Sequence, residues 1–199
     1  MSEHYFTEKP TSELNLRKIS VFVKGINLQL NTAAGIFSPD YIDNGTRLLI
    51  ESAVIKDNWN VLDLGCGYGV VGVAIKKLFP SITITMSDIN ERALKLAKMN
   101  SKLNKSGAII KKSNSFNSIK ETFDTILLNP PQTAGKNICF DMIEKSFEHL
   151  NKNGLLQVVA RHNKGGSTLE KRMQEIFGNV KETSKKSGYR IYISEKLDN

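Results

Sequence analysis

Apolar and polar residues alternate along this chain with two different periods, and the pattern predicts strands and helices in regular succession. Residues 19–23 and 26–30 alternate around Lys24-Gly25, which is typical of a β-hairpin. Further along, strands are predicted over 60–65, 82–87, 107–112, 124–129 and 154–160, and helices over 42–55, 70–79, 91–103, 137–150 and 167–177. Two last strands are predicted over 179–186 and 189–195, around Ser187-Gly188.

This order of elements predicts the α/β class. Alternating strands and helices favour a doubly wound, mostly parallel sheet of seven strands with helices on both faces. We expect residues 1–199 to form a single domain, in which residues 1–40 are an N-terminal extension with the hairpin and residues 41–199 are the core. A chain of 199 residues is long enough to bury a full hydrophobic core.

Composition limits the setting in which the protein works. No apolar run reaches the about 18 residues that a transmembrane helix needs, and the N-terminus lacks the apolar segment of a secretory signal. Cys66 and Cys139 do not have metal-ligand spacing, so we expect no metal site. Because Cys66 lies in a glycine-rich segment and Cys139 on a predicted helix, we expect no disulfide between them. These features predict a cytoplasmic protein that does not engage a membrane.

A glycine-rich segment follows directly after the predicted strand 60–65. Gly65, Gly67 and Gly69 stand at every second position before the helix over 70–79. Without a Cβ, the backbone there can turn tightly and approach a ligand, and the N-terminus of the following helix favours anionic or polar groups. Residues 67–72 also fit the dinucleotide pattern G-x-G-x-x-G, which on its own is a weak indication.

Two aspartates indicate which kind of ligand the glycine loop serves. Asp63 lies in the apolar end of a strand, where a carboxylate is costly unless it is paired. A pyrophosphate beside it would be repelled, whereas a cation such as the sulfonium amino acid of S-adenosylmethionine would be attracted. Asp88 ends the next apolar strand, where α/β nucleotide-binding units hold the ribose hydroxyls. The alternative role of Asp88 is an N-cap of the helix that begins near Glu91.

Asn129-Pro130-Pro131 ends the predicted strand 124–129. Neither proline can donate a ladder hydrogen bond, and the residue before a proline is held extended. The Asn129 amide oxygen and the Pro130 carbonyl are therefore presented as two acceptors, which suit the two hydrogens of a planar NH2 group. A turn capped by asparagine is the simpler interpretation, but the glycine loop upstream favours chemistry on an exocyclic amine.

In this order and spacing, residues 61–69 (Val-Leu-Asp-Leu-Gly-Cys-Gly-Tyr-Gly), 87–90 (Ser-Asp-Ile-Asn), 114–116 and 129–131 resemble the class I S-adenosylmethionine-dependent methyltransferases. Within that class the chain is most similar to the small domain of ribosomal RNA guanine-N2 methyltransferases, which it also resembles at 35–38 and 43–49. The resemblance covers roughly residues 4–195. It implies a Rossmann-like methyltransferase fold, S-adenosylmethionine as cofactor, and a final hairpin that adds an antiparallel strand to the sheet.

The resemblance also implies roles for single residues. The cofactor-binding residues that it implies are Asp63, Gly65, Cys66, Gly67, Gly69, Asp88, Ile89, Ser115, Phe116 and Asn129, with Thr46 as a weaker candidate near the methionine end. Asn129, Pro130 and Pro131 are the catalytic residues that it implies. Most of the rate would come from positioning the amine in line with the methyl group, and no strong general base is required because the ammonium product is very acidic.

One position departs from the family pattern. In the family that this chain resembles, Asn-Pro-Pro is usually followed by an aromatic residue that stacks on the target base, whereas this chain has Gln132. Stacking must then come from elsewhere. Phe37, Tyr41 and Phe116 are the candidates, and each of them could equally be packed in the core.

The charge favours a nucleic-acid partner. The net charge is +8 and the pI is near 9.4, and residues 161–190 carry eight Lys and Arg against three Glu. Many of these charges are those of ordinary solvated faces. The residues that we expect to bind RNA are Arg161, Lys185, Lys186 and Arg190, through phosphates, together with Phe37 and Gln132.

The sequence therefore predicts an N-methyltransferase acting on an exocyclic amine of an RNA base. Guanine N2 of ribosomal RNA is favoured, and transfer RNA comes next. Methylation of a protein glutamine or a small-molecule amine is an alternative that Gln132 disfavours. A non-catalytic RNA-binding module and a dehydrogenase agree less well with Asp63, Asp88 and Asn129. The target nucleotide, the number of methyl groups added and the oligomeric state stay open.

Overall fold

The computed structural model describes residues 16–33, 41–131 and 135–197. Its centre is a seven-stranded sheet in the order β5-β4-β3-β6-β7-β9-β8. The strands are β3 (Asn60–Leu64), β4 (Thr83–Asp88), β5 (Ile109–Lys112), β6 (Phe123–Leu128), β7 (Leu150–Arg161), β8 (Lys181–Lys186) and β9 (Tyr189–Glu195). Neighbours from β5 to β7 pair in parallel, and β9 pairs antiparallel with both β7 and β8. This confirms the mostly parallel sheet and its antiparallel final hairpin.

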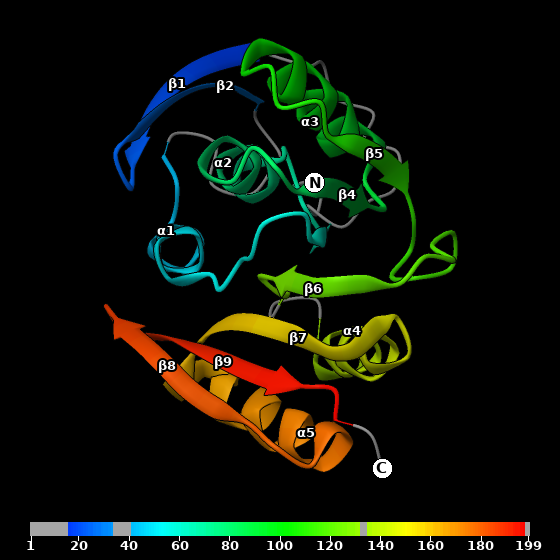
Figure 1. The fold of residues 1–199 in the computed structure, drawn as a ribbon. Coiled ribbons are helices and arrows are strands. Elements are labelled where there is room, and N and C mark those ends of the chain that lie inside the picture. Colours follow the sequence, from blue (N-terminus) through cyan, green and yellow to red (C-terminus); the bar gives the residue numbers. More distant parts are fainter. Residues whose placement is uncertain (1–15, 34–40, 132–134, 198–199) are drawn as a thin grey trace.

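Helices cover both faces of the sheet (Figure 1). One face carries α1 (Asn44–Ser52), α2 (Val70–Leu78) and α3 (Glu91–Leu103), and the other carries α4 (Lys136–Glu148) and α5 (Gly166–Phe177). A short 3-10 turn, η2 (His162–Lys164), joins β7 to α5. Each face has its own hydrophobic core, and β3 supplies both, since Val61 packs with the first core and Leu62 and Leu64 with the second.

The predicted N-terminal hairpin is present as β1 (Leu16–Val23) and β2 (Ile26–Ala33), which form a separate two-stranded sheet. A buried asparagine fixes it to the rest of the molecule. Asn100 of α3 accepts a hydrogen bond from Asn31 N at 2.6 Å, and its Nδ2 donates to the carbonyl oxygens of Asn31 and Tyr68, both at 2.9 Å. One side chain thereby joins the hairpin, α3 and the glycine loop.

Several predicted boundaries were wrong, and tertiary contacts explain one of them. Strand β1 begins three residues before the predicted start, and β2 ends three residues after the predicted end. The helix predicted over 42–55 ends at Ser52, because the backbone of Val54 is engaged by Gln157 of β7. Val54 N donates to Gln157 Oε1 at 2.9 Å, and Gln157 Nε2 donates to Val54 O at 2.7 Å. Strand β7 begins at Leu150, four residues before the predicted start, and its register against β6 shifts between Phe123 and Thr125.

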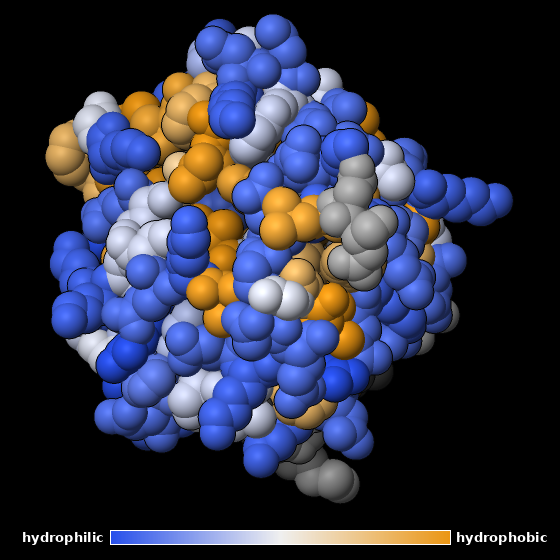
Figure 2. Space-filling model, turned by 60° about the horizontal axis from the view of Figure 1, so that its bottom comes forward, coloured by the Kyte–Doolittle hydropathy of each residue, from blue (hydrophilic) through white to orange (hydrophobic). Residues whose placement is uncertain are grey.

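The surface in the view of Figure 2 is mainly hydrophilic, with hydrophobic residues in separate groups. None of the helices in the described ranges is both long and apolar enough to cross a membrane.

Candidate active site

The site predicted from the sequence lies at the carboxyl edge of the parallel strands. Strand β3 lies between β4 and β6, so the glycine loop that follows β3 lies between Asp88 at the end of β4 and Asn129 directly after β6. Chain order reverses at this point of the sheet, which is where open α/β sheets bind their ligands. The fold therefore brings the two aspartates, the loop and the asparagine to one place.

The glycine loop has a backbone that only glycine adopts easily. Gly65, Gly67 and Gly69 have φ values of 69°, 56° and 86°, in the left-handed region. A Cβ on Gly69 would also lie 3.1 Å from the Cβ of Ala97 in α3. Gly67 N donates to Asp88 Oδ2 at 2.9 Å, which ties the loop to the end of β4.

Asp63 is a buried carboxylate behind the loop, with 3% of its surface exposed. Its Oδ2 accepts a hydrogen bond from Gly72 N at 2.8 Å. Burial raises the pKa of Asp63 from 3.8 to about 7, the Gly72 N–H opposes this rise, and the negative charge of Asp88 adds to it. A cationic ligand next to this carboxyl would favour its ionised form.

Asp88 is buried and does not cap the helix that follows. Asn90 is the N-cap of α3, and its side chain accepts from Ala93 N at 3.0 Å. The Asp88 carboxylate instead accepts from the backbone N–H groups of Gly67 and Asn90, both at 2.9 Å. The structural alternative for Asp88 is therefore wrong, because Asn90 performs the capping. Asp88 orders the loop on which the predicted cofactor would lie.

Asn129 is held by a chain of polar contacts to α1. Its Nδ2 donates to Thr46 Oγ1 at 3.1 Å, and the Thr46 hydroxyl makes a short hydrogen bond to Asp43 Oδ2. Asp43 is the N-cap of α1, and its Oδ1 accepts from Gly45 N at 2.8 Å and from Thr46 N at 3.1 Å. A hydroxyl has a single proton, and that of Thr46 is donated to Asp43 Oδ2, so the Thr46 oxygen accepts from Asn129 Nδ2. The Asn129 amide nitrogen therefore faces Thr46, and its oxygen faces away from Thr46.

Two buried side-chain oxygens without hydrogen-bond partners indicate that a polar ligand binds in this region. In the described part of the chain, Ser87 Oγ and Ser115 Oγ are the buried side-chain polar atoms that lack a hydrogen-bond partner. Ser87 lies just before Asp88, and Ser115 follows β5 with a left-handed φ of 50°. A nucleoside cofactor offers donors and acceptors for such oxygens, so the loop backbone, the buried carboxylates and these serines fit S-adenosylmethionine.

Of the other predicted cofactor residues, Cys66 is buried, which raises the pKa of its thiol, and Ile89 is half-buried. Phe116 lies in the core, with 4% of its surface exposed, and its ring stacks on His149 with centroids 4.4 Å apart. It is therefore too buried to be a platform for the target base, whereas its contact with the adenine stays a prediction. Tyr41, the other described candidate for stacking, is 69% exposed. Phe37 and Gln132 lie outside the described residues.

The predicted RNA-contacting residues gather near the end of β7. Lys185, Lys186 and Arg190 line a hollow of about 350 Å³ together with His162 and Tyr189. Arg161 lies over the Tyr189 ring, 5.4 Å from its centroid. Two of the charges are paired, since Arg190 bridges to Glu182, and Lys186 lies 3.5 Å from Glu51.

Sequence reasoning missed two residues of this region. In the sequence, Asp43 was considered only as part of the family motif at 43–49, although an aspartate just before a helical segment is an ordinary N-cap signal. Tyr189 packs so closely on α1 that a Cβ on Gly45 would lie 2.7 Å from Tyr189 Cε1. No sequence signal could have shown that contact. Within the described ranges, no group of three His, Cys, Asp or Glu side chains is placed to hold a metal ion.

The methyltransferase small domain family matches residues 27–193. The chain belongs to this family, which confirms the predicted class of S-adenosylmethionine-dependent methyltransferase and, with it, the predicted cofactor. It is 36% identical over 201 residues to a Bacillus subtilis protein named uncharacterized protein YbxB, with 99% of this chain and 100% of that protein covered.

Other relatives are longer than this chain. Ribosomal RNA small subunit methyltransferase C of Hamiltonella defensa is 33% identical over 170 residues, which cover 83% of this chain and 50% of that protein. The protein of the same name from Haemophilus influenzae is 38% identical over 138 residues, which cover 67% of this chain and 42% of its own. The chain thus spans about half the length of these curated relatives.

Among solved structures, the fold is similar to that of a 16S rRNA N2 methyltransferase from T. thermophilus in complex with AdoMet and guanosine. The TM-score is 0.79 at 20% identity, with 94% of this chain and 52% of that chain covered. At this identity the likeness concerns the fold alone.

Proposed function

We propose that this protein is an RNA N-methyltransferase that transfers the methyl group of S-adenosylmethionine to an exocyclic amine of a base, with guanine N2 of ribosomal RNA as the favoured substrate. The observation that carries the proposal is the Asn129 amide, which lies at the switch point of the sheet beside the glycine loop and is held in one orientation by Thr46. The names of the ribosomal RNA methyltransferase relatives support RNA as the acceptor.

In the proposed mechanism, Asn129 Oδ1 and the Pro130 carbonyl accept the two N–H groups of the target amine. These bonds turn the nitrogen lone pair, which is otherwise delocalised into the ring, toward the methyl group. Bound S-adenosylmethionine would supply that methyl group as an electrophile, and its S–C bond would break as the N–C bond forms. The ammonium product would then lose its proton to solvent. Positioning of the two reactants by Asn129, Pro130 and the rigid Pro131 supplies most of the rate.

Thr46 and Asp43 act through Asn129 in this scheme. An asparagine amide that could flip would present a donor to the substrate amine half of the time, where an acceptor is needed. The Thr46 oxygen, which accepts at 3.1 Å from Asn129, makes the productive orientation the stable one. We therefore assign Thr46 to the orientation of Asn129, in addition to its predicted place near the methionine end.

The remaining roles follow the geometry of the loop. Asp63 would favour the cationic methionine end, and Asp88 would hold the ribose hydroxyls beside Ile89. Ser115 would meet the adenine, with the glycine loop along the cofactor. Arg161, Lys185, Lys186 and Arg190 would contact RNA phosphates, and Phe37 and Gln132 are further candidates for RNA binding. Residues 41–199 would form the catalytic core in the cytoplasm, and residues 1–40 its N-terminal extension.

The test offers methyl-labelled S-adenosylmethionine and purified protein to unmodified ribosomal RNA, unmodified transfer RNA and total protein extract, followed by mass spectrometry of whatever takes label. We expect label on an exocyclic base amine in ribosomal RNA. Label only in transfer RNA would change the target, and label only in protein would overturn the RNA proposal. As a matched variant, Asn129→Ala should still bind the cofactor but turn over at least tenfold more slowly, a loss of roughly 1.4 kcal/mol or more. Unchanged turnover in this variant would refute the amine mechanism.

A further inference from the structure

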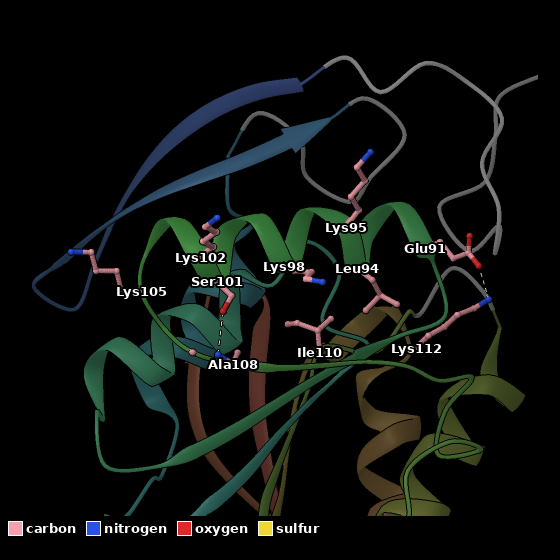
Figure 3. A pocket seen from close by; sticks show the side chains of 11 residues that line it. Glu91, Leu94, Lys95, Lys98, Ser101, Lys102, Lys105, Ala108, Ile110 and Lys112 are labelled. Atoms are coloured by element: carbon pink, nitrogen blue, oxygen red, sulfur yellow. Dashed lines mark hydrogen bonds and ion pairs between the residues drawn. The ribbon is translucent and has the colours of Figure 1, made fainter.

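A second basic surface lies on the opposite flank of the sheet from Lys185, Lys186 and Arg190. It is a hollow of about 920 Å³ between α3 and the edge strand β5, which we term the α3–β5 groove. Figure 3 shows its lining along the length of α3. Four lysines from this helix and its end contribute to the groove, and its floor includes apolar side chains; the lysines are Lys95, Lys98, Lys102 and Lys105, and the apolar residues are Leu94, Ala108 and Ile110.

The positive charge of the groove is not balanced by the described residues around it. Its one acidic lining residue is Glu91, which pairs with Lys112 at 2.7 Å. None of the four lysines on α3 and its end makes a side-chain hydrogen bond or an ion pair with another described residue, and all four are exposed. On a helix, like charges three and four residues apart repel each other. Gathering them on one face therefore costs stability, which binding of a polyanion would offset.

The position of the groove links it to the candidate site. α3 begins three residues after Asp88, and Lys112 of β5 is the register partner of Asp88 in β4. One end of the groove therefore lies at the carboxyl edge of the sheet, next to the proposed ribose site. From there it follows α3, which is about 20 Å long for its 13 residues. An extended ligand that enters the active site could continue along this flank.

We propose that the α3–β5 groove binds the sugar–phosphate backbone of the substrate RNA at nucleotides outside the target base. This inference rests on the proposed RNA methyltransferase function. Lysine ammonium groups are point charges that suit phosphates without reading sequence, and the apolar floor suits the carbon faces of ribose. Together with the cluster near the end of β7, the groove gives the RNA basic contacts on both sides of Asn129.

The test compares two double variants of exposed lysines. K98A/K102A removes two charges from the middle of the groove. K171A/K181A removes two exposed charges from α5 and β8, away from the groove, and is the matched control. Binding of a long unmodified ribosomal RNA fragment is measured over a series of salt concentrations. If both lysines contact phosphates, the slope of log K against log salt should become shallower by about 1.4–1.8 in K98A/K102A. It should not change in K171A/K181A.

Methylation assays separate the groove from the chemistry. K98A/K102A should lose kcat/KM for the long RNA and retain it for a short oligonucleotide that carries only the target site. Equal salt slopes for wild type and K98A/K102A, with RNA methylation intact, would overturn the groove and leave the proposed function standing. A wild-type protein that labels no RNA at all would instead overturn the function. Equal losses in both double variants would mean that only overall charge matters, which also refutes the groove.

Discussion

Replacing Thr46 by valine removes the hydroxyl between Asn129 and Asp43 and nearly preserves the side-chain volume. Thr46 is buried, with 4% of its surface exposed, so the change acts within the site and not at the surface. The variant loses the acceptor for Asn129 Nδ2 and the donor to Asp43 Oδ2. Asp43 keeps its two backbone donors, Gly45 N and Thr46 N, so the cap of α1 should survive.

The magnitude follows from one lost hydrogen bond. A typical intramolecular hydrogen bond contributes about 0.5–1.5 kcal/mol net, and a buried group left without a partner costs about 1–3 kcal/mol. If about 1–2 kcal/mol of this favours the productive orientation of the Asn129 amide, turnover should fall about five- to thirtyfold in Thr46→Val. Affinity for S-adenosylmethionine should change little, because the lost bonds act on the Asn129 amide and on Asp43 and leave the glycine loop, Asp63 and Asp88 unchanged.

The assay measures kcat with saturating cofactor and RNA, and cofactor affinity by calorimetry. Thr46→Ser keeps the hydroxyl and is the matched control, which should stay within about threefold of wild type. If Asn129→Ala is slow but a folded Thr46→Val protein keeps full turnover, the orientation argument is refuted. Weaker cofactor binding with normal kcat would instead assign Thr46 to the methionine end alone.

Three further changes test other parts of the site. Asp88→Ala should weaken cofactor binding about ten- to a hundredfold by calorimetry, because it removes a charged hydrogen-bonding group worth about 1.5–3 kcal/mol; an unaltered affinity would contradict the ribose assignment. The pKa of the Asp63 carboxyl is about 7 in the folded state and 3.8 in the unfolded state, so between these pH values the folded protein binds more protons. The free energy of unfolding should therefore fall as the pH rises from about 4 to 7 and should level off above pH 7. In urea titrations, Asp63→Asn should remove this pH dependence of stability, and the same slope in both proteins would contradict the burial argument. Cofactor binding by the wild type should tighten toward pH 8 as Asp63 ionises, and this change should also be lost in Asp63→Asn. Gly72→Ala would place a Cβ 2.3 Å from Met86 Sδ and 3.1 Å from Asp63 Oδ2, so it should lower stability by about 1–3 kcal/mol, read as a drop in Tm; an unchanged Tm would mean that Met86 repacks without strain.

Local sequence determined most of the elements because their signals are local. The periods of apolar residues, the left-handed glycines of the loop and the two prolines after Asn129 each restrict the backbone where they stand. The carboxyl ends of parallel strands then necessarily meet at one edge. For this reason Asp63, Asp88 and Asn129 could be expected at one site from the sequence alone, although they lie far apart in the chain.

Only the tertiary structure determined the contacts between side chains of distant segments. Asn129 and Thr46 are 83 residues apart in sequence, and Gln157 ends α1 from a distance of 103 residues. Phe116 is buried because it packs in the second hydrophobic core, where His149 stacks on its ring. The α3–β5 groove exists because β5 is the outermost parallel strand beside α3. Such pairings depend on how helices and strands pack, and packing is fixed by the whole core and not by any local pattern. The sequence therefore predicted where the proposed chemistry lies, and the tertiary structure determined how the Asn129 amide is oriented.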